Sequence, residues 1–261
     1  AAMYQSIAVM HVLIASLVGG IAVLGWFDDR HSLRIRTRII VQIAIACAMV
    51  YLLAPFQGIN IAGYRFEQPD WLLFVGLVVW IVWMTNLFNF MDGIDGLVAT
   101  QSTIAAIVLG SWFHQAGAPE LVSLNLALAG ALAGFSILNW RPARVFLGDI
   151  GSLTLGIYFA VMGIIGWTVY RLPVEAFVLL YGVMLCDTSV TLVVRIFKGE
   201  RWWEAHSSHF YQRLVGLGYN HAQVTSLTLV ITLCLSIFGS FVIHNVGPGW
   251  LWMTLGLITL A

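Results

Sequence analysis

The sequence predicts an all-α protein, a polytopic bundle of transmembrane helices that forms one integral membrane domain over residues 1–261. Three observations carry this prediction. Hydrophobic residues make up 60% of the chain and charged residues 9%, whereas soluble domains carry about 25% charged residues. The apolar residues gather in runs of roughly 20, the length a helix needs to cross a bilayer. The runs are uninterrupted rather than alternating, which favours helices over the strands of a membrane barrel.

The length rule places about nine spans along the chain. They lie near 7–26, 38–55, 71–90, 97–113, 121–138, 152–169, 174–194 and 223–243, with a ninth, clipped span from 249. The chain opens Ala-Ala-Met-Tyr without an initiator methionine and ends inside an apolar run. We therefore expect it to be a fragment at both ends.

The basic residues predict the orientation of the spans. Ten of the twelve lysines and arginines fall in alternate loops, and Arg65 and Arg171 fall in the others. The positive-inside rule then places the richer set in the cytoplasm and the N-terminus outside. The main cytoplasmic loop is expected at about 195–222. Because the net charge is +0, no bulk field suggests a nucleic-acid partner. The ten are Arg30, Arg34, Arg36, Arg38, Arg141, Arg144, Arg195, Lys198, Arg201 and Arg213.

A polar stripe marks the end of the third span. Asn86, Asn89, Asp92 and Asp95 recur at every third position of Asn-Leu-Phe-Asn-Phe-Met-Asp-Gly-Ile-Asp-Gly-Leu. On a helix this spacing places them on one drifting face. Amides and carboxylates at membrane depth are costly unless something binds them. The alternative is an ordinary helix end with turn residues, because Asp-Gly occurs twice and favours turns.

Two further acidic motifs are predicted on the same side of the membrane. Asp28 and Asp29 are adjacent carboxylates at the exit of the first span, where they repel each other unless a cation lies near. Asp149 lies between Gly148 and Gly151 at the start of the sixth span, where backbone N–H groups can face an anion. An acid beside such a start suggests a bridging Mg²⁺. A solvated helix end and a simple Gly-Asp turn are the respective alternatives.

The main cytoplasmic loop carries two histidines three residues apart, His206 and His209, followed by Arg213. No third histidine or cysteine accompanies them, so phosphate recognition fits better than a transition metal. Two solvated loop histidines are the alternative. Asp187 lies inside a span, near its cytoplasmic end. We expect it to pair with a polar group of a neighbouring helix.

Together, these motifs resemble the polyprenyl-phosphate N-acetylhexosamine-1-phosphate transferase family, also called glycosyltransferase family 4, which includes phospho-MurNAc-pentapeptide transferase. The resemblance runs from Asp28 to Arg213 and includes the stretch from Asn86, Phe-Leu-Gly-Asp-Ile-Gly-Ser and Asp187-Thr188. The form His-x-x-His-x-Tyr-Gln resembles the branch that initiates O-antigen synthesis. Ser208 stands where the family often has a third histidine. Family members also have helices before the Asp-Asp pair, so the resemblance implies an N-terminally truncated chain.

The resemblance implies an enzyme, a Mg²⁺-dependent phospho-sugar transferase with Mn²⁺ as the alternative metal. It would transfer an N-acetylhexosamine-1-phosphate, or its N-acetylated 6-deoxy counterpart, from a UDP-sugar to undecaprenyl phosphate and release UMP. The product would initiate O-antigen-type cell-envelope polysaccharide. The implied location is the bacterial inner membrane, with the active site facing the cytoplasm. The resemblance leaves a homodimer open.

The resemblance also implies roles for individual residues, at a site where Asp28, Asp92, Asp149 and His209 converge at the cytoplasmic rim of the helices. The expected metal ligands are Asp149 and Asp92. The expected catalytic residues are Asp28 and Asp29, which orient or deprotonate the lipid phosphate, with Asp92 and His209. The expected substrate-binding residues are Asn86, Asn89, Asp95, Asn139, Phe146 stacking on uracil, His206 and Arg213.

Three other classes of membrane protein share some of these features. An ion- or proton-coupled transporter is the main alternative, and it would place its acids near the midplane on broken helices. An intramembrane aspartyl protease needs Gly-x-Gly-Asp, whereas residues 146–149 read Phe-Leu-Gly-Asp. A CDP-alcohol phosphotransferase needs Asp-Gly-x-x-Ala-Arg, whereas Thr100 replaces the arginine after Asp95-Gly-Leu-Val-Ala.

Overall fold

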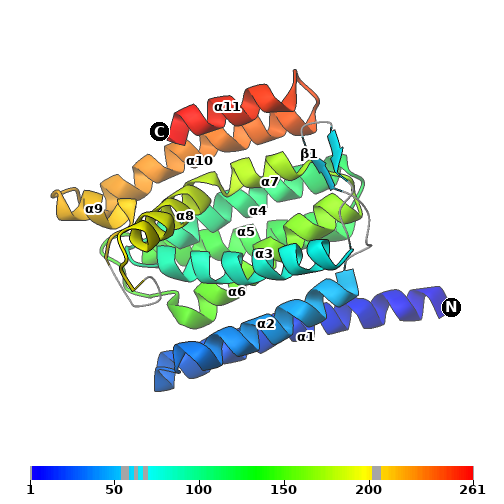
Figure 1. Ribbon diagram of the computed structural model, residues 1–261, viewed down its shortest axis with the longest axis horizontal. Helices are drawn as coiled ribbons and strands as arrows, with labels where there is room; N and C mark the ends of the chain where they lie inside the picture. Colours follow the sequence, from blue (N-terminus) through cyan, green and yellow to red (C-terminus); the bar gives the residue numbers. More distant parts are fainter. Residues whose placement is uncertain (1, 54–58, 62–63, 67–69, 202–206, 261) are drawn as a thin grey trace. The chain divides into compact units, whose positions relative to one another are not determined.

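The computed structural model describes residues 2–53, 59–61, 64–66, 70–201 and 207–260, and this part of the chain is helical apart from one short hairpin (Figure 1). The predicted all-α class is confirmed. The hairpin, β1 (Ile59–Ile61) paired with β2 (Tyr64–Phe66), was not predicted. The helices are α1 (Ala2–His31), α2 (Ile35–Leu53), α3 (Asp70–Met91), α4 (Leu97–Gln115), α5 (Pro119–Asn139), α6 (Gly148–Thr168), α7 (Val174–Leu180), α8 (Gly182–Phe197), α9 (Phe210–Gly216), α10 (His221–Ile243) and α11 (Gly249–Leu260).

The chain forms two compact units that are interleaved along the sequence. The first comprises Ala1–Asn60, Tyr64–Asn89 and Leu147–Arg171, and the second comprises Ile61–Gly63, Phe90–Phe146 and Leu172–Ala261. Two compact units can still belong to one folding domain, so the prediction of a single domain over residues 1–261 stays a prediction.

In the first unit, α1 packs against both α2 and α6. Glycines allow close helix contacts, as is common between membrane helices. A Cβ at Gly25 would lie 2.6 Å from backbone atoms of Asp149 and Ile150, and one at Gly156 would lie 2.6 Å from the backbone of α3. The rings of Phe88 and Phe159 stack beside the second contact, with centroids 5.4 Å apart. These contacts bring the ends of α1 and α3 to the start of α6.

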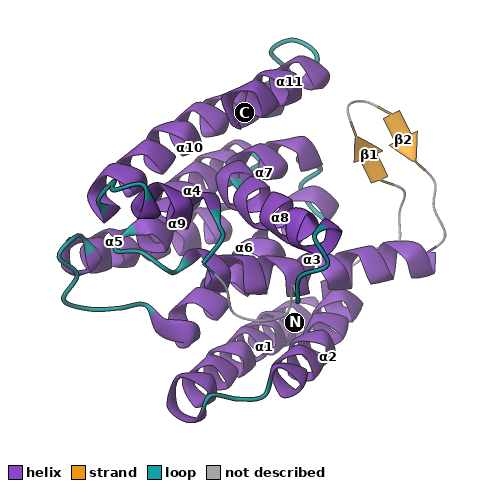
Figure 2. Cartoon of the chain, turned by 60° about the vertical axis from the view of Figure 1, so that its left-hand side comes forward, coloured by secondary structure: helices purple, strands orange, loops and turns teal. Residues whose placement is uncertain are grey.

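In the second unit, α10 packs against α4, α7, α8, α9 and α11 (Figure 2). Polar side chains join α4 to α10. The Thr232 hydroxyl donates to the Gln101 side-chain oxygen, and Trp112 Nε1 donates to Ser240 Oγ at 3.0 Å. Hydrogen bonds between helices are one of the few attractive forces that remain where lipid is as apolar as the protein core. These two bonds fix α10 against α4.

Among the described residues, seven helices are long and apolar enough to cross a membrane. A bent pair, α7 with α8, makes an eighth if it counts as one span, and the short α11 occupies the place of the clipped ninth. The predicted span 174–194 is therefore broken, with an angle of 79° between its halves. The break falls at Tyr181, and Gly182 then begins α8 close to Leu235. Both residues suit an apolar run, so hydropathy could not reveal the break.

Candidate active site

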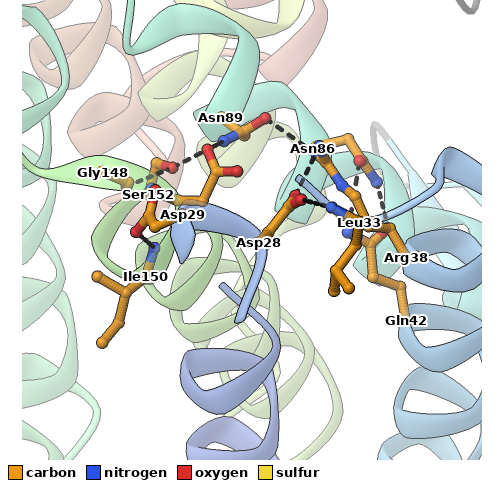
Figure 3. Close-up of polar contacts among 11 residues, drawn as sticks. Asp28, Asp29, Leu33, Arg38, Gln42, Asn86, Asn89, Gly148, Ile150 and Ser152 are labelled. Carbon is orange, nitrogen blue, oxygen red and sulfur yellow. Dashed lines mark hydrogen bonds and ion pairs between the residues drawn. The ribbon is translucent and has the colours of Figure 1, made fainter. Parts of the chain in front are cut away.

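The first unit holds a polar network around the buried carboxylate of Asp28, in the last turn of α1 (Figure 3). Its Oδ2 pairs with Nη1 of Arg38 at 2.7 Å, and its Oδ1 accepts the Leu33 backbone N–H at 2.7 Å. Arg38 also donates through Nη2 to Asn89 Oδ1 at 3.2 Å. The sequence placed Arg38 only among the cytoplasmic bases. In the structure, Arg38 is the cation that bridges Asp28 on α1 and Asn89 at the end of α3.

Asn89 connects this arginine to the start of α6. Its Nδ2 donates to Asp149 Oδ1 at 2.6 Å and to Ser152 Oγ at 3.0 Å. Since its oxygen faces Arg38 and its nitrogen faces Asp149, the orientation of the amide is determined at both ends. Asn89 therefore holds the carboxylate that the sequence predicts as a metal ligand.

Asp29 caps the start of α6 from another helix (Figure 3). Its Oδ1 accepts the Asp149 N–H at 2.9 Å, and its Oδ2 accepts the Ile150 N–H at 3.1 Å. Gly148 has a φ of +66°, and a Cβ there would lie 2.9 Å from Asp29 Oδ2. The sequence predicted that these N–H groups face an anion. In this structure the anion is the carboxylate of Asp29.

Asn86, the first residue of the polar stripe, pairs with a residue of α2. Its Nδ2 donates to Gln42 Oε1 at 2.6 Å, and Gln42 Nε2 donates back at 3.4 Å. Both side chains are buried. This reciprocal pairing satisfies Asn86 without a ligand, and its predicted substrate-binding role stays a prediction.

The carboxylates of the first unit fit a hard divalent cation. Asp149 interacts electrostatically with both Asp28 and Arg38, so two acids share a small region with one arginine. Among the described residues, no group of three or more histidine, cysteine or acidic side chains forms a metal cage. Mg²⁺ commonly binds through one or two carboxylates, with substrate phosphates and water completing its shell. The donor set therefore suits Mg²⁺ and does not suit a preformed zinc site.

In the second unit, Asp95 and Asn139 tie the turn after α3 to the segment after α5. Asp95 Oδ2 accepts the Ala143 N–H at 3.3 Å, and Asn139 Oδ1 accepts the Gly96 N–H at 3.0 Å. Asn139 Nδ2 donates to Val145 O at 2.8 Å. Phe146, the last residue of this segment, is 71% exposed. Two predicted substrate-binding residues thus shape the loop that presents the third.

His221 belongs to the same cluster, and no motif in the sequence identified it. Its Nδ1 lies 3.4 Å from Asp95 Oδ1 and 3.3 Å from the Asp95 backbone nitrogen. It is the first residue of α10, and Asn220 before it caps that helix by accepting the Gln223 N–H at 3.0 Å. The contact between His221 and Asp95 spans 126 residues, so no local motif could reveal it.

Asp187 and His209 form a second buried pair in this unit, with His209 Nδ1 3.1 Å from Asp187 Oδ1. The predicted pairing of Asp187 with a polar group is confirmed. Arg213, which is exposed, donates through Nε to Ser208 O at 2.9 Å. Asp92 is half-buried in the turn after α3. His206 lies outside the described residues. The predicted convergence of Asp28, Asp92, Asp149 and His209 stays a prediction, because each cluster is described within its own unit.

These features define the class of protein. It is a polytopic helical membrane protein with paired carboxylates, an arginine and amides at the ends of its helices, a set suited to phosphorylated, metal-bound ligands. The sequence profile of Glycosyl transferase family 4 matches residues 9–167. The chain therefore belongs to that family, as its motifs suggested.

Individual relatives narrow the comparison. A Bacillus subtilis protein named "Probable undecaprenyl-phosphate N-acetylglucosaminyl 1-phosphate transferase" is 28% identical over 223 residues, covering 83% of this chain and 62% of the relative. The phospho-N-acetylmuramoyl-pentapeptide-transferase of Staphylococcus saprophyticus is 30% identical over 250 residues, 88% of this chain and 75% of the relative. That of Desulforudis audaxviator is 27% identical over 246 residues, 85% of this chain and 72% of the relative. The chain thus spans less than two thirds of the Bacillus protein's length.

Proposed function

We propose that this protein transfers a sugar 1-phosphate from a UDP-linked N-acetylhexosamine, or an N-acetylated 6-deoxyhexosamine, to undecaprenyl phosphate, with release of UMP. The observation that carries the proposal is the network of Asp28, Arg38, Asn89 and Asp149, which gathers acids, a cation and an orienting amide at helix ends. The names of the relatives support the same reaction class.

The chemistry explains why such a network is needed. An oxygen of the lipid phosphate attacks the sugar-bearing phosphorus, the new P–O bond forms, and the bond to UMP breaks with its electron pair leaving on UMP. Both reactants are anions, so their approach requires positive charge. Arg38 supplies one such charge, and Asp28 holds its guanidinium. Mg²⁺, held by Asp149, would offset the charge of the diphosphate when bound.

The neighbouring acids Asp28 and Asp29 have different contacts in the first unit. Asp29 accepts two backbone N–H groups of α6 and so sets the position of Asp149. Asp28 lies beside Arg38 and interacts with Asp149. We therefore assign Asp28 to the lipid phosphate, and Asp29 to the placement of the metal ligand.

The second unit supplies candidates for the nucleotide and the sugar. The exposed ring of Phe146 offers a face on which uracil can stack. Asp95 and Asn139 hold the segment that carries this ring. Arg213 and His209, with His206, are the proposed contacts for phosphate or sugar. The position of α9 within the main loop agrees with that assignment.

The finer features of the proposal rest on sequence. The His-x-x-His-x-Tyr-Gln form supports initiation of O-antigen-type polysaccharide, part of lipopolysaccharide and cell-wall biogenesis. The division of the arginines and lysines between alternate loops supports an active site on the cytoplasmic face of the bacterial inner membrane. A homodimer is compatible with this proposal, which does not depend on it.

One observation favours the transporter alternative. The bent α7–α8 pair is a broken span, and Asp187 lies on α8 five residues after its start. Broken helices with acids are what an ion-coupled transporter would use. The carboxylate of Asp187, however, accepts hydrogen bonds from the start of α9. That engagement favours a structural tie over an ion-binding role.

The deciding experiment is a membrane assay of the full-length protein with undecaprenyl phosphate and radiolabelled UDP-sugars. We expect a chloroform-soluble, Mg²⁺-dependent product and an equal amount of UMP with one of the UDP-N-acetylhexosamines. If no donor of this class gives a lipid-linked product, the proposal is wrong. Ion flux into proteoliposomes without such a product would favour the transporter.

A further inference from the structure

The carboxylate of Asp187 is the hub of a buried hydrogen-bond cluster in the second unit. Its Oδ1 accepts the Phe210 N–H at 2.9 Å, and its Oδ2 accepts the Tyr211 N–H at 3.1 Å. The ring Nδ1 of His209 lies 3.1 Å from Oδ1, and the hydroxyl of Thr191 lies 3.4 Å from it. Asp187 is 6% exposed and His209 3% exposed. One acid on α8 therefore organises the first residues of α9.

This contact determines which nitrogen of the histidine carries a proton. An ionised carboxylate only accepts hydrogen bonds. The His209 atom that faces it must therefore be an N–H donor, so Nδ1 is protonated. A ligand would therefore meet Nε2, the other ring nitrogen, which is a hydrogen-bond acceptor in this tautomer. A carboxylate that fixes one ring nitrogen selects the tautomer and the orientation of the other.

Two aromatic residues lie beside the histidine ring, with their planes nearly parallel to it. The centroid of the His209 ring lies 6.2 Å from that of Phe90 and 5.8 Å from that of Tyr211, with planes inclined by 28° and 16°. The Tyr211 hydroxyl donates to Phe90 O at 2.9 Å. A Cβ at Gly93 would lie 2.1 Å from that hydroxyl. Tyr211 thus occupies the space above the turn that contains Asp92.

A helix cap alone does not require this arrangement. Any neutral side-chain oxygen could accept the N–H groups at the start of α9. A buried carboxylate is more costly, because removing its hydration requires several kcal/mol that its partners must offset. The additional feature that a carboxylate provides is a charged acceptor for the ring N–H of His209.

We propose that Asp187 is a positioning residue for the transfer reaction, holding His209 as its Nδ1–H tautomer so that Nε2 accepts a hydrogen bond from a hydroxyl group of the nucleotide sugar. Tyr211 fixes this histidine relative to the turn that carries Asp92. The inference rests on the proposed function. It adds Asp187, Tyr211 and a defined ring nitrogen to the residues that the motifs identified.

The test begins with Asp187→Asn, which retains the size of the side chain and removes its charge. Long-range ¹H–¹⁵N spectra of the ligand-free protein in nanodiscs report the tautomer, with His209→Gln identifying the signal. We expect the Nδ1–H pattern in the parent and its loss in the variant. The kcat of the variant should fall about 10- to 100-fold, as for other residues that orient a functional histidine. Asp70→Asn, at the exposed start of α3, is the matched control and should change neither readout.

A double-mutant cycle separates positioning from folding. If Asp187 acts through His209, Asp187→Asn/His209→Gln should be no slower than His209→Gln alone. Asp187→Glu, which retains the charge, should restore part of the rate if Asp187→Asn folds poorly. An unchanged tautomer in Asp187→Asn, or losses that multiply in the double variant, would overturn the proposal. A parent that transfers no sugar phosphate would instead overturn the proposed function, while the spectra still decide whether Asp187 orients His209.

Discussion

The starts of α6 and α9 are built by the same device. Each carries a residue that the motifs predict to be functional, Asp149 on α6 and His209 immediately before α9. In each, an acid from another helix accepts two successive backbone N–H groups. Asp29 does so at 2.9 and 3.1 Å, and Asp187 does so at 2.9 and 3.1 Å. The caps are tertiary contacts, and each also places a negative charge at the positive end of a helix.

The two starts differ in how the functional side chain is held. At α6, Asp29 accepts backbone N–H groups, and Asn89 holds the carboxylate of Asp149. At α9, Asp187 holds both the backbone and the ring of His209. Asp29 is exposed, whereas Asp187 is buried. At α6, substituting Asp29 changes the backbone contact and substituting Asn89 changes the side-chain contact, so the two effects can be separated. At α9, substituting Asp187 changes both contacts at once.

The largest effect is expected when the functional residue of α6 is itself changed. Asp149→Asn removes the charge that the proposed metal site requires but leaves the cap from Asp29 in place. We expect turnover to fall by about 100- to 1,000-fold, the range for losing a charge-stabilising group. Membrane insertion and thermal stability should match those of the parent. Turnover near that of the parent would remove the metal role from Asp149 and leave α6 without its assigned function.

The next effect tests how closely α1 must approach the start of α6. A Cβ in Gly25→Ala would lie 2.6 Å from backbone atoms of Asp149 and Ile150, so the helices must separate. Overpacking of this kind costs about 1–3 kcal/mol, and displacement of a site by about 1 Å can cost 100-fold in rate. Thermal unfolding and the transfer assay measure the two effects.

Gly19→Ala is the matched control for this substitution. Gly19 lies on the same helix, and a Cβ there would meet nothing within 4 Å. The variant should be at least as stable as the parent, since alanine favours helix. Equal losses for Gly19→Ala and Gly25→Ala would show that helix flexibility, rather than the approach to α6, controls activity.

The helices themselves were predictable because their signal is local. Length and hydropathy predicted seven spans close to those described. The predicted four-residue polar stripe was only partly right, because Asn86 and Asn89 lie on α3 whereas Asp92 and Asp95 lie in the turn after it. The break at Tyr181 was not predictable, because a turn of the backbone inside an apolar run leaves hydropathy unchanged. Next to the break, a Cβ at Gly182 would lie 2.9 Å from Leu235, a residue that is distant in sequence.

The site was predictable in its residues and not in its connections. The motifs identified Asp28, Asn89 and Asp149, and these residues belong to one hydrogen-bond network. Arg38 was counted as one base among ten, since nothing local distinguishes it from Arg34 or Arg36. The cap from Asp29 spans 120 residues. Local sequence predicts which groups must be satisfied, while the fold decides which partner satisfies them.

A smaller effect should follow from changing the cap of α6 alone. Asp29→Asn retains an oxygen that can accept one backbone N–H but loses the charge and the second bond. We expect a loss of about 0.5–2 kcal/mol in stability, the range for helix N-caps. Turnover should fall by much less than in Asp149→Asn, because Asn89 still holds the Asp149 side chain. Chemical unfolding and the transfer assay measure the two. Inactivation as complete as that of Asp149→Asn would assign Asp29 a chemical role and end the parallel with a simple cap.

The smallest effect is expected at the aromatic contact of α9, where Tyr211→Phe removes the hydroxyl that donates to Phe90 O. Its loss should cost about 0.5–1.5 kcal/mol of stability, with a slight decrease in kcat, because Asp187 still holds His209.

Burial, with the charges of Asp187 and Asp92, raises the pKa of Tyr211. In the unfolded chain the phenol ionises near its usual pKa of about 10. The stabilisation should therefore be constant below about pH 10 and decline above it, as the unfolded state alone loses its proton. Unfolding measured from pH 7 to pH 10.5 should show a larger decline in the parent than in Tyr211→Phe. A decline of equal size in both would mean that another group is responsible, and that α9 is held in place by Asp187 alone.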